Sequence, residues 1–250
     1  MRERLRLAVP MLAILAVSPF AARHPLKLPV GWTAQSEGRR EAARERWQKV
    51  SEIFALMAVA PGGAVADVGA GSGFFTVRLA DAVGAAGRVY AVDISEQVLR
   101  DLRERVERDG RGNVTVVAGE TDDPCLPESS VDAVLINNAY HEMGAHDAML
   151  DHLWSALRPG GRLVIVDQID ASRRDADRER QTARHEIGPG FVQADLEAAG
   201  FEVVATHDPF IERGGGDLWW LIVARRPPAG TPGAVGSDTD PGVGIARGRR

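Results

Sequence analysis

The chain has 250 residues and a mass of 26.9 kDa, a length that suits one α/β domain with short extensions. Its net charge of −5 and pI near 5.7 give no overall basic character for binding RNA or DNA. The sequence has a single cysteine, Cys125, which excludes an internal disulfide and a cysteine-rich zinc site. We expect this thiol to behave as a small buried hydrophobe.

The N-terminal segment has the pattern of an export signal. Three arginines among the first six residues precede an apolar stretch at 7–17, and a basic region followed by an apolar run of about 7–15 residues is typical of secretory signals. We therefore predict that residues 1–22 form a signal or anchor outside the folded domain, with 5–20 as the segment that would contact a membrane. An amphipathic helix is the alternative. Residues 23–38 contain Pro and Gly and predict an irregular linker.

The rest of the chain alternates between strand and helix patterns. A helix is predicted at 39–57, where apolar residues recur at helical spacing. The charge-dense stretch 170–186 predicts a solvated, partly mobile segment, and 227–250 is rich in Pro, Gly, Ser, Thr and Asp, which predicts disorder. Strands are predicted at 64–68, 88–93, 114–118, 131–137, 162–167, 202–206 and 218–225, and further helices at 74–83, 96–109, 145–157 and 191–199. This alternation predicts a doubly wound, mostly parallel, seven-stranded Rossmann-like α/β sheet with helices on both faces, in a domain spanning 39–226.

A glycine-rich turn joins the first predicted strand to the helix after it. The turn reads Asp67-Val-Gly69-Ala-Gly71-Ser-Gly73, and its glycines permit positive φ angles and close approach of a ligand. The next predicted strand ends in Asp93, where an acidic side chain can accept hydrogen bonds from both ribose hydroxyls of a nucleoside. Together these two features predict a nucleoside-binding βαβ unit.

The spacing of the glycines distinguishes between two kinds of nucleoside cofactor. A dinucleotide site requires its third glycine at position 74, which here is Phe74. The form of the turn instead resembles motif I of the class I S-adenosylmethionine-dependent methyltransferases. That cofactor has no pyrophosphate, and a carboxylate near the loop suits its sulfonium cation.

The resemblance covers roughly residues 45–226 and implies a role for several residues. It places Asp93 on the ribose, Ile94 beside the adenine and Asp122 on the exocyclic amine of the adenine, with Asn137 in the cofactor-side turn after the fourth strand. It also implies an antiparallel last strand. The complete implied cofactor-binding set is Asp67, Gly69, Ala70, Gly71, Gly73, Asp93, Ile94, Asp122 and Asn137.

The acceptor side is predicted at the end of the fourth strand. Ligands of open α/β sheets bind beyond the carboxyl ends of the strands, where Tyr140 and His141 are the best-placed polar residues. His141 can act as a general base near neutral pH, or it can only orient the loop. We expect no metal, because the spacing of His141, His146 and His152 fits neither a helical pair nor a familiar cluster. In the resembling family a lid over the substrate forms after the fifth strand, which here is the segment 170–186.

The sequence therefore predicts a methyltransferase that moves a methyl group from S-adenosylmethionine to a small or lipid-like acceptor, and it predicts no nucleic-acid partner. The motifs are most similar to the ubiquinone/menaquinone-biosynthesis type. The single cysteine disfavours the arsenite methyltransferases, which need several. Two alternatives stay open: a nicotinamide-dependent oxidoreductase, and a non-catalytic protein that binds an S-adenosyl ligand. Since the cofactor is made in the cytosol, a cytoplasmic location is the alternative to export.

Overall fold

The computed structural model describes residues 30–230. The chain divides into two units, Met1–Arg40 and Glu41–Arg250. The predicted signal segment, residues 1–22, lies outside the described residues, and so does most of the C-terminal tail. None of the helices within 30–230 is long and apolar enough to cross a membrane.

Helix α1 occupies Val30–Trp47 and is followed by α2, Val50–Met57. The prediction of an irregular segment up to residue 38 is therefore wrong from Val30 onward, because residues that favour helices outweigh the scattered glycines. The single helix predicted at 39–57 is in fact broken at Lys49, which has a φ of 52°. The break separates a charged helix from an apolar one that buries Val50, Ile53 and Met57.

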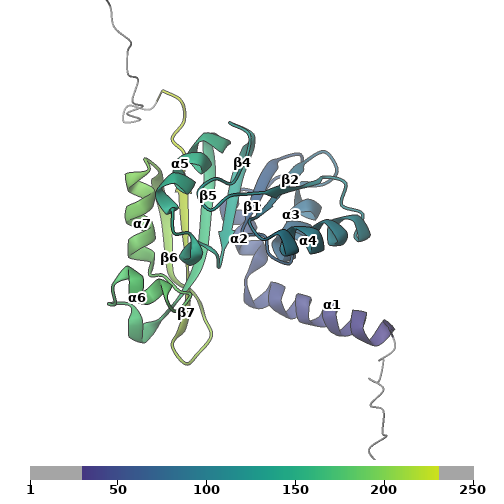
Figure 1. Ribbon diagram of the computed structural model, residues 1–250, viewed down its shortest axis with the longest axis horizontal. Coiled ribbons are helices and arrows are strands. Elements are labelled where there is room, and N and C mark those ends of the chain that lie inside the picture. The colour runs from purple at the N-terminus through teal and green to yellow at the C-terminus, as the bar shows by residue number, and fades with distance from the viewer. Residues whose placement is uncertain (1–29, 231–250) are drawn as a thin grey trace, which may run out of the picture. The chain divides into compact units, whose positions relative to one another are not determined.

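A seven-stranded sheet forms the centre of the second unit, in the order β3-β2-β1-β4-β5-β7-β6. The first five strands are parallel, and β7 runs antiparallel to both of its neighbours, as the resemblance implied. The strands are β1 Ala64–Val68, β2 Arg88–Asp93, β3 Val114–Ala118, β4 Val131–Asn137, β5 Leu157–Asp170, β6 Glu202–Glu212 and β7 Asp217–Arg225. The helices that connect them are α3 Phe74–Val83, α4 Glu96–Arg108, α5 His146–Ala156 and α7 Pro189–Ala198. The predicted doubly wound α/β fold is confirmed (Figure 1).

Both faces of the sheet are covered, as alternation along the strands requires. In β7, Trp220 and Ile222 belong to the cluster that contains the buried residues of α5 and α7. Their neighbours Leu221 and Val223 belong to the cluster that contains those of α2 and α3. The carboxyl ends of the parallel strands thus emerge between two packed helical layers.

The charge-dense stretch contains short helices, η2 Ala171–Arg173 and α6 Arg178–Thr182. Gln181 is fully buried, and its Nε2 atom donates to three backbone carbonyls, those of Arg173, Arg174 and Ala176. A count of charges predicts a solvated segment, but it does not detect this internal anchor. One buried amide can organise a short loop in this way, because a buried polar group without a hydrogen bond would destabilise the fold.

Cys125 lies in the loop after β3 and is exposed. The expectation of a buried thiol is therefore wrong. The backbone explains the exposure: Cys125 N–H donates to the Asp123 carboxylate at 2.6 Å, in a tight turn that gives Cys125 a φ of 52°. Such a turn holds the side chain at the surface rather than in the core.

Candidate active site and cofactor pocket

The glycine turn follows β1 and takes the backbone into the left-handed region at three alternate positions. The φ angles of Gly69, Gly71 and Gly73 are 76°, 52° and 75°. A Cβ at Gly69 would lie 2.6 Å from that of Ala139, and one at Gly73 would lie 2.5 Å from the Leu102 Cδ1 atom. A Cβ at Gly71 would meet nothing within 4 Å. Two glycines are therefore needed for packing, whereas Gly71 borders open space.

Asp93 faces this turn from the end of β2. One of its carboxylate oxygens accepts the Gly71 N–H at 3.0 Å, and the other accepts the Ser95 N–H at 3.0 Å. Ser95 in turn caps α4 by accepting from Val98 N–H. These contacts fix the carboxylate beside the glycine turn, which is where a ribose can reach it.

A pocket of about 380 Å³ opens at the carboxyl ends of β1, β2 and β4. Its lining is mainly apolar, and Ile94 projects there with 60% of its surface exposed. The only charged residues that line it are Asp93, Glu120 and Glu142, so the described part of the chain places no lysine or arginine at the pocket wall. The full lining is Val68, Gly69, Val92, Asp93, Ile94, Glu120, Thr121, Pro124, Ala139, Glu142, Met143, Gly144, Ala145 and Met149.

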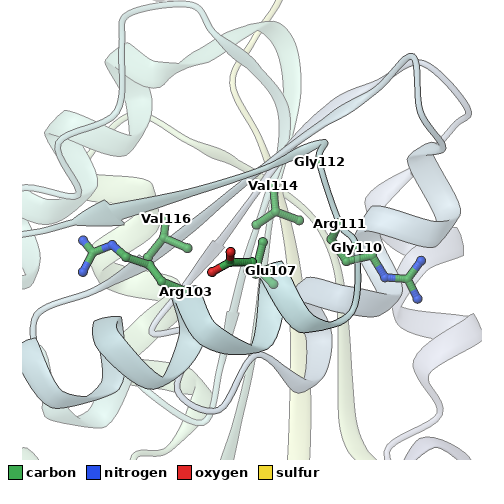
Figure 2. A pocket seen from close by; sticks show the side chains of 8 residues that line it. Arg103, Glu107, Gly110, Arg111, Gly112, Val114 and Val116 are labelled. Atoms are coloured by element: carbon green, nitrogen blue, oxygen red, sulfur yellow. The ribbon is translucent and has the colours of Figure 1, made fainter.

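A second hollow, of about 490 Å³, lies at the outer edge of β3 and is lined by Arg103, Glu107, Arg111 and the valines Val114 and Val116, among others (Figure 2). It includes neither the glycine turn nor Asp93. Figure 2 shows the Arg103 and Arg111 side chains extending away from each other, so they do not converge on a common ligand. The pocket at the strand ends is therefore the better candidate for a cofactor site.

His141 is buried beside β5, in the short helix η1, Tyr140–Glu142. Its Nδ1 atom lies 2.9 Å from one carboxylate oxygen of Asp167, and its backbone N–H donates to the other at 3.2 Å. Burial alone would lower the pKa of His141, but the hydrogen bond and the negative charge of Asp167 outweigh it, so this pKa is raised. Asp167 is fully buried, and burial raises its pKa although His141 counteracts the effect.

Asp167 was missed as a site residue by the sequence reasoning, which considered only Glu142 as the group that could orient His141. The order of the strands would have indicated Asp167. In the register of the two strands Asn137 of β4 lies opposite Val166 of β5, so the turn after β4 meets the residue after Val166. Adjacent parallel strands always bring their carboxyl ends together in this manner.

Tyr140 is buried and points toward α7 rather than into the pocket. Its hydroxyl donates to an Asp195 carboxylate oxygen at 2.9 Å, and Arg178 Nη2 donates to the same carboxylate at 2.7 Å. Burial, followed by the negative charge of Asp195, raises the pKa of the tyrosine hydroxyl. In this arrangement Tyr140 ties η1 to α7, and it is not among the residues that line the pocket.

Comparison with known proteins agrees with this geometry. Residues 65–161 match a family model described as a methyltransferase domain. The solved structure of an S-adenosylmethionine-dependent methyltransferase from Aquifex aeolicus superposes with a TM-score of 0.63 and 26% identity, over 74% of this chain and 93% of that one. Residues 65–161 are thus a methyltransferase domain, and the chain as a whole is similar to the class I S-adenosylmethionine-dependent methyltransferases.

The curated relatives of this chain include enzymes named for small molecules. An arsenite methyltransferase from Halobacterium salinarum is 31% identical over 156 residues, which is 60% of this chain and 40% of the relative. A demethylmenaquinone methyltransferase from Listeria welshimeri is 30% identical over 122 residues, 49% of this chain and 51% of the relative. The chain thus spans about half the length, or less, of these relatives.

The other residues that the methyltransferase resemblance implied lie at varied depths. Asp67 is buried, and it accepts a hydrogen bond from the Thr76 hydroxyl at 2.6 Å. Burial raises its pKa to about 6. Asp122 is exposed, and the neighbouring Glu120 and Thr121 line the pocket. Asn137 is partly buried, and its Oδ1 has no hydrogen-bond partner among the described residues.

Proposed function

We propose that this chain transfers the methyl group of S-adenosylmethionine to a small or lipid-like acceptor. The observation that supports it best is the pocket at the strand ends, which combines apolar walls with carboxylates and lacks basic residues among those described. The cofactor carries a sulfonium and an ammonium group but no phosphate, so an acidic wall suits it. A nicotinamide dinucleotide would place its negatively charged pyrophosphate beside the same carboxylates. The resulting repulsion disfavours the oxidoreductase alternative.

The residues present fit this cofactor at both of its ends. Asp93 offers carboxylate oxygens beside the glycine turn for the ribose hydroxyls, and the exposed Ile94 offers an apolar surface for the adenine. Gly71 leaves open space where the amino-acid tail would pass. We assign Asp67 the role of a buried negative charge below the turn that favours the cationic ligand.

The chain's contribution to the reaction is position and electrostatics. S-Adenosylmethionine supplies an electrophilic methyl group, and the protein must hold an acceptor atom in line with it. His141 is the polar group that we place on the acceptor side, because η1 follows β4 directly and Glu142 of the same helix lines the pocket. Asp167 fixes the imidazole through Nδ1, so Nε2, which lies 3.7 Å from Glu142 Oε1, is the nitrogen left for a partner on the acceptor side.

The acceptor is proposed to be a small or lipid-like molecule rather than a nucleic acid. The curated relatives are named for arsenite and demethylmenaquinone, and the net charge of the chain is −5, which disfavours a polyanion. These 250 residues hold one cysteine, which disfavours a thiol-rich arsenic site within them. A quinol-like or other apolar acceptor is the better expectation.

Calorimetric titration with S-adenosylmethionine tests the cofactor site. Gly71→Val should abolish binding, because the added side chain enters the space that the cofactor needs. Gly110→Val is a matched control: its φ is 65°, against 52° for Gly71, and a Cβ at either position meets nothing within 4 Å. Gly110 lines the hollow at β3, so this control also tests the rival cavity. Loss of binding only in Gly110→Val would refute the assignment.

Methyl transfer is tested separately. The protein should be incubated with methyl-labelled cofactor and a fractionated cell extract, and the labelled product should partition with small molecules or lipids. Label that appears only in nucleic acid would contradict the acceptor class. Tight cofactor binding without labelling of any fraction would favour a non-catalytic binding protein.

We also propose that residues 1–22 direct export or anchoring, on the strength of the basic and apolar sequence pattern alone. Residues 1–30 fused to a reporter that is active only outside the cytosol test this directly. An inactive reporter, with the full-length protein in the cytosolic fraction, would refute the proposal and favour a cytoplasmic enzyme.

A further inference from the structure

We propose that His141, Glu142 and His185 bind a divalent transition-metal ion beside the cofactor pocket, with a coordination position left open for an oxygen of the acceptor. The part that concerns the acceptor rests on the proposed function, whereas the metal site stands on the geometry alone. The donor atoms of the three residues all lie within 4.8 Å of one another. The sequence reasoning expected no metal because it considered only histidines between 141 and 152, and His185 comes from the loop before α7.

The spacing of these donors is close to that of a tetrahedral zinc site. Glu142 Oε1 lies 3.7 Å from His141 Nε2 and 3.5 Å from His185 Nδ1. Donors at about 2.0–2.1 Å from a tetrahedral zinc ion are about 3.3 Å apart. The side chains of Glu142 and His185 are 64% and 76% exposed, so small rotations can close the remaining distance while a fourth position stays accessible.

The buried carboxylate of Asp167 gives His141 the orientation that a ligand needs. It lies 2.9 Å from Nδ1, which favours a proton on that nitrogen of the neutral imidazole and leaves the lone pair of Nε2 for a ligand on the side of Glu142. A carboxylate behind a metal-binding histidine is a recurring arrangement that fixes the tautomer and raises the basicity of the ligand. Nε2 lies 3.7 Å from the nearest Glu142 oxygen, which is too far for a hydrogen bond.

The segment that carries His185 is anchored to the residue next to Asp167. Gln168 accepts the Ile187 N–H at 3.0 Å through its backbone carbonyl and donates from Nε2 to the His185 carbonyl at 3.2 Å. Both halves of the site are therefore fixed to consecutive positions of β5. His185 has a φ of 55°, a strained conformation that other parts of the structure must stabilise and that is common at ligand-binding positions.

The donor set indicates the class of metal. Two imidazole nitrogens and one carboxylate oxygen suit zinc and its neighbours cobalt and nickel, whereas magnesium and calcium prefer oxygen ligands. A second cluster, His146, Asp147 and Asp195, also has donors within 4.8 Å of one another. It is the weaker candidate because Asp195 already accepts hydrogen bonds from Arg178 and from a tyrosine hydroxyl.

Metal titration tests the site directly. The full-length protein, made without a histidine tag and stripped by a chelator, should bind one equivalent of Zn²⁺ by calorimetry, and Co²⁺ should give the visible absorption of a tetrahedral site. His185→Asn should weaken binding at least tenfold while preserving the fold, because Asn tolerates the left-handed conformation. Asp167→Asn should weaken it about 10- to 100-fold. His146→Ala and His207→Ala are the controls and should bind like the unmodified chain.

Unchanged Zn²⁺ affinity in His185→Asn, or a loss confined to His146→Ala, would overturn the site. Mg²⁺ binding as tight as that of Zn²⁺ would also overturn it. Titration of the same variants with S-adenosylmethionine separates this proposal from the proposed function. His185→Asn should keep its cofactor affinity, and a chain that binds zinc at these residues but no cofactor would refute the function and leave the metal site standing.

Discussion

Asp67 provides the sharpest test of the electrostatics of this fold. Its carboxyl group is fully buried at the end of β1, and burial raises its pKa from 3.8 to about 6. The hydrogen bond from Thr76 and the charge of Arg44 lower the pKa but do not offset the burial. The folded state therefore binds a proton more tightly than the unfolded state does, and an ionised Asp67 is a cost to stability at neutral pH.

The size of this cost follows from the shift. A change of about two pKa units corresponds to about 3 kcal/mol, at 1.36 kcal/mol per unit. Because the folded pKa is raised, the favourable contribution is complete below about pH 4 and is lost as the pH rises through about 6. Asp67→Asn removes the charge and keeps an oxygen that can accept from Thr76. We expect the variant to be more stable than the unmodified chain by up to about 3 kcal/mol at pH 7 and to match it at pH 4.

Urea denaturation followed by circular dichroism at pH 4, 5, 6 and 7 measures this difference. Thr76→Val is the matched control, because it keeps the volume but removes the hydroxyl donor, and it should destabilise the protein by about 1–3 kcal/mol at pH 7. A stability difference between Asp67→Asn and the unmodified chain that is the same at pH 4 and pH 7 would refute the reasoning. So would a variant that is less stable at pH 7.

Three further predictions follow from individual contacts. Gly73→Ala should destabilise the fold by more than the roughly 1–2 kcal/mol of left-handed backbone strain alone, because the added Cβ would lie 2.5 Å from Leu102. A loss in the free energy of unfolding no larger than that strain would contradict the packing argument. Asp93→Ala should weaken cofactor binding by about 1.5–3 kcal/mol for each charged hydrogen bond lost, and Asp93→Asn should weaken it less; equal affinity of both variants and the unmodified chain in calorimetry would remove Asp93 from the ribose. Tyr140→Phe should cost about 1 kcal/mol of stability, since its hydroxyl bonds Asp195, and should leave cofactor affinity unchanged; a large loss of affinity at unchanged stability would instead place the hydroxyl in the pocket.

The central part of the fold could be predicted because its signals are local. Strands β1 to β4 have the predicted bounds, since each is a short apolar run closed by a glycine or a polar turn. The last strands were less predictable. Strand β6 extends to Glu212, where the prediction ended at 206, because its far half is set by pairing with β7. The length of a strand in a hairpin depends on its partner strand, and the local sequence pattern contains no information about that partner.

The candidate pocket at the strand ends could be predicted for the same reason, whereas the surroundings of His141 could not. Gly69, Asp93 and Ile94 lie within one βαβ unit, and all three line the observed pocket. Asp167 and His185 approach His141 only through the order of the strands and the fold of the loop before α7. Contacts between such distant segments do not produce a spacing pattern that can be recognised in a single sequence. The contact of Asp167 with His141 is the exception, because it follows once β4 and β5 are taken as neighbours.

The two most deeply buried carboxylates of the sheet stand at strand ends on either side of β4. Asp67 is the next-to-last residue of β1, and Asp167 lies near the end of β5. Both are buried completely, and burial raises the pKa of each. A sheet optimised for stability alone would carry apolar residues there. Burying a charged carboxylate has a large desolvation cost, whereas an apolar side chain of similar volume has none. The compensation must come from groups that these carboxylates orient or attract. Thr76 and His141 supply part of it within the chain. The remainder is what a cationic cofactor at one carboxylate, and a metal-bound imidazole at the other, would provide.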